Sequence, residues 1–100
     1  MDKSEAISKV KAYRMLLKEH FNMYEVYLFG SYAKDTYNED SDIDVAIVVD
    51  QVDGDYFTVN PLLWKVRRQI DDRIEPILIE RKYDEGNFLD EVKKSGIEIV

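Results

Sequence analysis

The segment that most constrains the fold of this chain is DIDVAIVV, residues 42–49, in which two aspartates open an apolar run. The β-branched residues of that run are typical of a buried β-strand. Because successive side chains of a strand point to opposite faces of the sheet, Asp42 and Asp44 share one face, while alternate residues from Ile43 onward face the core. The sequence therefore predicts a buried strand that begins with two carboxylates, roughly 6–7 Å apart at the backbone.

Acidic side chains are crowded around this strand start: Glu39, Asp40, Asp42 and Asp44 lie within six positions. Like charges repel, and burial without a cation raises the pKa of such a carboxyl group. A divalent metal removes that cost, and magnesium prefers ligand sets made of oxygen atoms. We therefore interpret Asp42 and Asp44 as a metal site. The residues alone leave one alternative open, a merely solvated strand start.

The pair Gly30–Ser31 ends an earlier strand-like run, residues 25–29, ten residues before the segment SDID. A glycine at a strand end lets the backbone approach a ligand closely. A helix that starts at Ser31 offers free N–H groups to a phosphate, to which the serine hydroxyl can also donate. Ser31 has the alternative role of a helix cap, and the two roles are compatible. Lys34 is a candidate phosphate contact, although an exposed lysine is more often only solvated.

Two longer helices are indicated by apolar residues at helical spacing. The first covers residues 4–20. The second follows an acidic loop over 50–60, where Asn60 and Pro61 are typical of an N-cap and a first helical residue. On the second helix, the pair Arg67–Arg68 is expected to face water or a partner.

The remaining segments complete a small sheet. We expect strands over 25–29, 42–49, 74–80 and 97–100, and a short helix over 87–95 that Gly96 closes. Pro76 removes one ladder donor from the third strand and so favours an edge position. The order of these elements indicates an α+β fold (α/β mixed), a small mixed β-sheet of about four strands with helices packed on it.

Composition limits the classes of function open to the chain. Its 100 residues predict a single domain over 1–100. The net charge of −7, from 14 basic against 21 acidic side chains, disfavours long nucleic-acid substrates, which usually meet a basic face. No apolar run is long enough to span a membrane. Since the sequence shows neither a signal peptide nor a cysteine, we expect a cytoplasmic protein.

Gly30–Ser31, followed by Ser41–Asp42–Ile43–Asp44 at the head of an apolar strand, resembles the DNA polymerase beta-like nucleotidyltransferase superfamily. The short length makes the chain similar to the minimal nucleotidyltransferase (MNT) group of that superfamily. The resemblance implies that the glycine and serine hold the triphosphate of ATP and that the two aspartates bind two magnesium ions (Mg²⁺). It also implies a third metal-binding carboxylate on a later strand, for which Glu75 is the candidate.

The sequence departs from the family pattern at two positions. Asp35 stands where a glycine is usual, although an aspartate tolerates a left-handed turn better than most residues. The third acid is usually an aspartate, whereas Glu75 is one methylene longer and precedes Pro76. Asp72 is a second candidate for the third carboxylate, and Glu75 has the alternative of simply facing solvent on an edge strand.

The resemblance implies an enzyme that moves AMP from ATP to a hydroxyl group. For an MNT domain it implies a helical protein partner of the HEPN type in a toxin–antitoxin pair, with the MNT domain as antitoxin and AMP placed on a tyrosine of the toxin. Two alternatives stay open: a catalytically decayed module that neutralises or scaffolds a helical partner by contact, and a purely structural subunit. The nucleobase preference and a homo- or hetero-oligomeric state are also left open.

Overall fold

A computed structural model of the chain describes residues 1–20, 22, 25–50, 56–84 and 86–100. Its elements are α1 (Lys3–Leu17), β1 (Glu25–Phe29), α2 (Ser31–Lys34), β2 (Ile43–Val49), α3 (Tyr56–Val66), the 3-10 turn η1 (Arg67–Gln69), β3 (Ile74–Glu80), the 3-10 turn η2 (Arg81–Tyr83), α4 (Phe88–Ser95) and β4 (Ile97–Glu98). None of the helices in these ranges is long and apolar enough to cross a membrane.

The strands form one mixed four-stranded sheet in the order β3–β2–β1–β4. β1 runs antiparallel to both β2 and β4, whereas β2 and β3 are parallel. The predicted α+β fold is therefore confirmed. Within the described part of the chain β3 is an edge strand, as the position of Pro76 inside it predicts.

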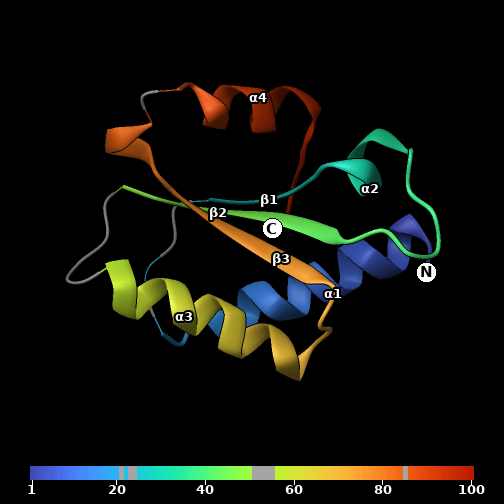
Figure 1. The fold of residues 1–100 in the computed structure, drawn as a ribbon, viewed down its shortest axis with the longest axis horizontal. Helices are drawn as coiled ribbons and strands as arrows, with labels where there is room; N and C mark the ends of the chain where they lie inside the picture. Colours follow the sequence, from blue (N-terminus) through green and yellow to red (C-terminus); the bar gives the residue numbers. More distant parts are fainter. Residues whose placement is uncertain (21, 23–24, 51–55, 85) are drawn as a thin grey trace.

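Helices cover both faces of the sheet, with α1 and α3 on one side and α4 on the other (Figure 1). Alternate residues of β2 enter the two cores: Ile43 and Ile47 pack with α1 and α3, and Ala46 and Val48 pack with α4. This is the alternation that the sequence predicts. It places Asp44, which has the same parity as Ala46, on the α4 face.

α1 forms where capping and periodicity predict it. The Asp2 carboxylate accepts a hydrogen bond from the backbone N–H of Glu5 at 2.8 Å. The Tyr13 hydroxyl donates to the Leu63 carbonyl of α3 at 2.7 Å, which ties the two helices together. The helix ends at Leu17, three residues before the predicted end. Its apolar stripe is fully buried and consists of Ala6, Val10, Tyr13 and Leu17.

The predicted start of α3 is wrong. The helix begins at Tyr56 rather than at Pro61, so Asn60 is not its N-cap and the predicted loop is shorter than 50–60. Residues 51–55 of that loop lie outside the described residues. The apolar stripe of buried Leu63 and Val66 continues upstream to half-buried Val59, and packing of that stripe extends the helix past the proline. Pro61 removes one backbone hydrogen bond near the helix start.

Candidate active site

The predicted site residues gather at one end of the sheet, where β1 ends and β2 and β3 begin. In register, Phe29 of β1 lies opposite Asp44 of β2, and Asp44 lies beside Glu75 of β3. We call this set the Phe29–Asp44–Glu75 row, which lies on the α4 face. Asp42 immediately precedes β2 and is exposed. The structure thus places Glu75, which is distant in the sequence, beside Asp44.

Gly30 forms the turn between β1 and α2 with a φ of 71° and a ψ of −147°, a conformation open almost only to glycine. A Cβ atom added at this position would lie 2.1 Å from Oδ2 of Asp44. The glycine therefore lets the Asp44 carboxylate lie directly against the turn that leads into Ser31. The sequence predicts that a ligand approaches this backbone closely; the structure places the Asp44 carboxylate there, and the approach of a ligand stays a prediction.

The surroundings of Asp44 disfavour its negative charge. Burial, followed by the negative charges of Glu75 and Asp42, raises the pKa of the Asp44 carboxyl group to about 6. Among the residues that the structure describes, none donates a hydrogen bond to the Asp44 carboxylate or forms an ion pair with it. A half-buried carboxylate among like charges, with no partner cation in the described part of the chain, is typical of a position that meets a positively charged ligand.

The site carboxylates have the right ligand atoms for a divalent cation, but they are not spaced to surround one. Their donors are oxygen atoms only, which magnesium prefers, and the glycine turn leaves room for the Asp44 carboxylate. Within the described ranges, however, no three acidic, histidine or cysteine side chains are gathered closely enough to surround one ion. Asp42, Asp44 and Glu75 would have to rotate toward one another to share a cation.

The candidate phosphate contacts lie at α2 and at the turn that precedes it. Gly30 occupies the N-cap position and Ser31 is the first helical residue, so Ser31 does not cap the helix with its side chain. Lys34 is exposed and lines a groove of about 260 Å³ that also contains Phe29, Gly30 and Phe88. The lysine and the glycine turn therefore face the same space between α2 and α4, where a phosphate group would find both.

Asp35 ends α2 in the left-handed conformation, with a φ of 61° and a ψ of 29°. Its carboxylate accepts a hydrogen bond from the Lys3 amino group at 3.0 Å. The prediction that an aspartate tolerates this turn in place of the usual glycine is confirmed.

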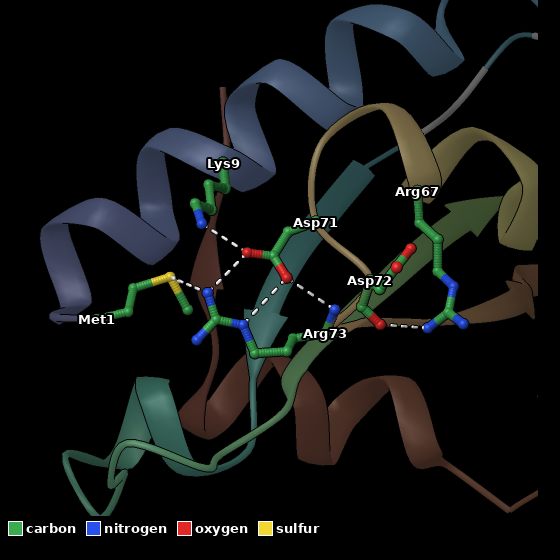
Figure 2. Close-up of polar contacts among 6 residues, drawn as sticks. All are labelled: Met1, Lys9, Arg67, Asp71, Asp72 and Arg73. Atoms are coloured by element: carbon green, nitrogen blue, oxygen red, sulfur yellow. Dashed lines mark hydrogen bonds and ion pairs between the residues drawn. The ribbon is translucent and has the colours of Figure 1, made fainter.

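Glu75 and Asp72, the two candidates for the third carboxylate, occupy different places. Glu75 is half-buried, lies in register with Asp44, and contributes to the raised pKa of that residue. Asp72 is exposed in the turn before β3, and its backbone carbonyl accepts from Nη1 of Arg67 at 2.6 Å (Figure 2). The geometry favours Glu75 over Asp72, while the role of Glu75 in catalysis stays a prediction.

Sequence reasoning missed a polar network that fixes the turn before β3 (Figure 2). The Asp71 carboxylate accepts from Nε and Nη2 of Arg73 at 3.0 and 2.8 Å, and from the Lys9 amino group of α1 at 2.5 Å. These bonds, those of Arg73 first, hold the pKa of Asp71 well below its usual range. The Arg73 carbonyl accepts from the N–H of Ile43 at 2.8 Å. The network therefore anchors the strand starts that carry the site carboxylates to α1.

The structure also corrects the expectation that the pair Arg67–Arg68 faces water. Arg68 is exposed, but Arg67 is half-buried and donates to the carbonyls of Asp72 and Ile74 at 2.6 and 3.0 Å. Its guanidinium group lies 4.6 Å from the ring centroid of Trp64. The reason is that η1 turns the chain after α3 and directs Arg67 toward the start of β3.

A nucleotidyl-transferring enzyme is the class that this fold and site define: a mixed sheet presents a glycine turn beside two aspartates and a glutamate at the open end of parallel β2 and β3. The chain belongs to the nucleotidyltransferase domain family, whose family model matches residues 10–99. It is therefore a nucleotidyltransferase, and a nucleotide is one of its substrates. Enzymes of this family typically use a divalent metal.

Two relatives agree with this assignment. The chain is 36% identical over 76 residues to a candidate protein adenylyltransferase of Methanocaldococcus jannaschii, with 74% of this chain and 76% of the relative covered. It is also similar to the crystal structure of a candidate nucleotidyltransferase from Sulfolobus solfataricus. That match has a TM-score of 0.67 and 27% identity, and it covers 96% of this chain and 80% of the other.

Proposed function

We propose that the chain transfers AMP from ATP to a hydroxyl group of a protein partner, with magnesium as the metal. The observation that carries the proposal is the contact of Asp44 with the Gly30 turn, with Glu75 in register beside it. This contact places carboxylates that could bind a cation next to the turn where a triphosphate would lie. The relative described as a candidate protein adenylyltransferase supports both the adenine nucleotide and the protein acceptor.

The carboxylates have distinct parts in the proposed reaction. Asp42, Asp44 and Glu75 would hold two magnesium ions, which neutralise charge on the phosphate oxygens when bound. The acceptor oxygen attacks the α-phosphorus of ATP, the bond from that phosphorus to the bridging oxygen breaks, and pyrophosphate leaves. The hydroxyl proton passes to the Glu75 carboxylate, which lies at the edge of the sheet from which an acceptor can enter.

The other end of the site would hold the leaving group. Gly30 and Ser31 would position the β- and γ-phosphates through the backbone and the serine hydroxyl. Lys34 would add a positive charge from the groove that it shares with Gly30. These donors favour departure of pyrophosphate because its negative charge grows as the bond to the α-phosphorus breaks.

The acceptor that we propose is a tyrosine of a HEPN-type helical protein, the toxin of a pair in which this chain is the antitoxin. Support comes from the resemblance to the MNT group and from the relative described as acting on protein. The net charge of −7 favours a protein over a long nucleic acid as acceptor. The cytoplasm, which supplies ATP, is the location that we propose.

The test is transfer of label from α-³²P-ATP to the product of the neighbouring gene. We expect labelling that requires magnesium, stops on addition of EDTA, and falls to background in the Asp42→Ala/Asp44→Ala double variant. A chain that binds its partner but never labels it, at any magnesium concentration, contradicts the proposal.

The second candidate is a decayed module that acts on its partner by contact. One observation favours it: within the described ranges the carboxylates are not gathered around a common point. Inhibition of the partner that persists in the Asp42→Ala/Asp44→Ala variant, without label, would select this function. A purely structural subunit is tested by heat, since a ligand that binds only the folded state raises the melting temperature. Millimolar ATP with magnesium leaves the melting temperature of such a subunit unchanged.

A further inference from the structure

The α4 face of the sheet carries two grooves separated by Phe88. One lies between α2 and α4 and contains Gly30 and Lys34. The other, also of about 260 Å³, follows the outer edge of β3; we call it the β3-edge groove, and its lining is Ile77–Glu80, Tyr83, Asp84 and Phe88. Phe88 belongs to both and packs edge-on against Phe29, with ring centroids 5.9 Å apart. Phe29 of the Phe29–Asp44–Glu75 row lines the first groove, and Ile77, two residues after Glu75, lines the second.

The β3-edge groove exposes large apolar and aromatic surface. Exposed fractions are 40% for Ile77, 64% for Tyr83 and 40% for Phe88. No strand of the described part of the chain pairs with the outer side of β3. Exposed apolar surface that is rimmed by charge marks a place where another molecule binds.

The side from which the acceptor approaches the phosphorus indicates what occupies this groove, and this step rests on the proposed function. In such transfers the attacking and leaving oxygens lie roughly in line at the reacting phosphorus. Pyrophosphate leaves at the Gly30 turn after β1, and the α-phosphorus is held at Asp44 of β2. Since β3 lies on the far side of β2 from β1, the acceptor approaches from β3, past Glu75.

The β3-edge groove begins close to Glu75, where the acceptor approaches. Ile77 follows Glu75 by two residues on the same face of β3, which separates them by roughly 6–7 Å along the strand. An acceptor chain whose hydroxyl group lies at Glu75 therefore places a neighbouring side chain over Ile77 and Tyr83. Phe88 lies between this side chain and the groove that contains Lys34.

Charges around the groove favour a basic occupant. Glu75 lies two residues before Ile77, and the charged residues of the groove lining are Glu80 and Asp84. Arg81, which follows Glu80, pairs instead with Asp50 beyond the end of β2, at 3.9 Å. With a net charge of −7 on the whole chain, complementary potential requires positive charge on the bound segment.

We infer that the β3-edge groove is the docking site for the acceptor protein. Its occupant is an extended segment with three features: a hydroxyl side chain at Glu75, an apolar or aromatic side chain about two to four residues away, and flanking lysine or arginine residues. The groove thereby selects the hydroxyl group that receives AMP, and it does so separately from nucleotide binding.

Short synthetic peptides and α-³²P-ATP test this inference on the full chain. Each peptide carries one tyrosine and a neighbouring leucine, flanked either by lysines or by glutamates. We expect the lysine peptide to be labelled with a kcat/KM at least about tenfold above that of the glutamate peptide, and the difference to shrink in high salt. The Ile77→Ser/Tyr83→Ala variant loses about tenfold in kcat/KM for the lysine peptide. Its melting-temperature rise with ATP and magnesium is unchanged, which shows that it folds and binds nucleotide.

The matched control is Met15→Ser, which removes an equally exposed apolar side chain, 63% exposed, from α1 on the opposite side of the sheet. It leaves both peptide labelling and the response to ATP unchanged. If ATP and magnesium fail to stabilise the unaltered chain, the proposed function itself fails. If the chain labels its protein partner but peptide labelling is absent, or is indifferent to peptide charge or to the groove variant, the proposed function stands and the docking inference is overturned.

Discussion

Gly30 and Asp44 depend on each other at the level of single atoms. The turn after β1 has a backbone conformation that only glycine adopts easily, and the Asp44 carboxylate occupies the space that a Cβ atom would fill. A glycine before a serine predicts a place of close approach. The partner in that approach is a side chain from another strand, which only the strand pairing reveals.

Replacing Gly30 with alanine tests this dependence. The new Cβ atom would lie 2.1 Å from Oδ2 of Asp44 and the backbone would be strained, so we expect a loss of about 1–3 kcal/mol in the free energy of unfolding. Urea denaturation measures it. Gly86→Ala is the matched control, because a Cβ atom there meets nothing within 4 Å. Equal effects of the two substitutions would contradict the close contact.

The raised pKa of Asp44 makes a prediction about stability and pH. The folded state binds the Asp44 proton more tightly than the unfolded chain, whose aspartates titrate near 3.9. Stability is therefore lost as the pH rises from about 4 to 6, and the loss is complete above that range. In metal-free buffer we expect Asp44→Asn to stabilise the protein by about 1–2 kcal/mol at pH 7.5 and by little at pH 4.

Thermal unfolding across that pH range measures the effect, with Asp40→Asn as the control for loss of an exposed carboxylate in the preceding loop. The same substitution at Asp44 should abolish label transfer. If Asp44→Asn is less stable than the unaltered chain at pH 7.5, the charge of Asp44 is not disfavoured by its surroundings.

At the level of elements, local patterns predict most helices and strands, and long-range contacts explain the differences. The Asp2 cap, the stripe of α1 and the alternation in β2 are local and agree with the structure. Pro61 is a local signal that tertiary packing overrides, because the apolar stripe of α3 extends upstream of it. The Asp71 network was missed because its partner Lys9 lies 62 residues away in the sequence.

Asp71→Asn tests that network as an anchor between α1 and the start of β3. Asp71 accepts charge-assisted bonds from Arg73 and Lys9, so we expect a loss of about 2–3 kcal/mol at pH 7. Because the folded-state pKa of Asp71 is lowered, this contribution is full above the unfolded pKa and is lost progressively as the pH falls from about 4 toward the lowered folded-state pKa. Denaturation at pH 7 and at low pH measures both parts.

Asp72→Asn is the control, since Asp72 contributes its backbone carbonyl, not its carboxylate, to the contacts of this turn. If the loss caused by Asp71→Asn is the same at low pH as at pH 7, the network is not held by the charge of Asp71.

At the level of the whole molecule, the order of the strands sets the side of the site on which each substrate would bind. Gly30, Asp44 and Glu75 were predicted from the sequence, but not that the turn after β1 lies against Asp44 of β2 while Glu75 of β3 lies in register beside it. Phe88, which lines both, separates the groove that contains Lys34 from the β3-edge groove. The grooves escaped sequence reasoning because Ile77, Tyr83 and Phe88 are ordinary apolar residues until the fold leaves them exposed together.

Paramagnetic broadening by Mn²⁺ with ATP tests most directly whether the Phe29–Asp44–Glu75 row holds the metal and the nucleotide. With substoichiometric Mn²⁺ substituted for Mg²⁺, we predict that the backbone amide signals of Gly30, Ser31, Asp44 and Glu75 broaden first. Those of Met15 and Trp64, on the helices that cover the other face, should keep their intensity. Broadening centred elsewhere on the acidic surface, or spread evenly over the chain, would contradict the account.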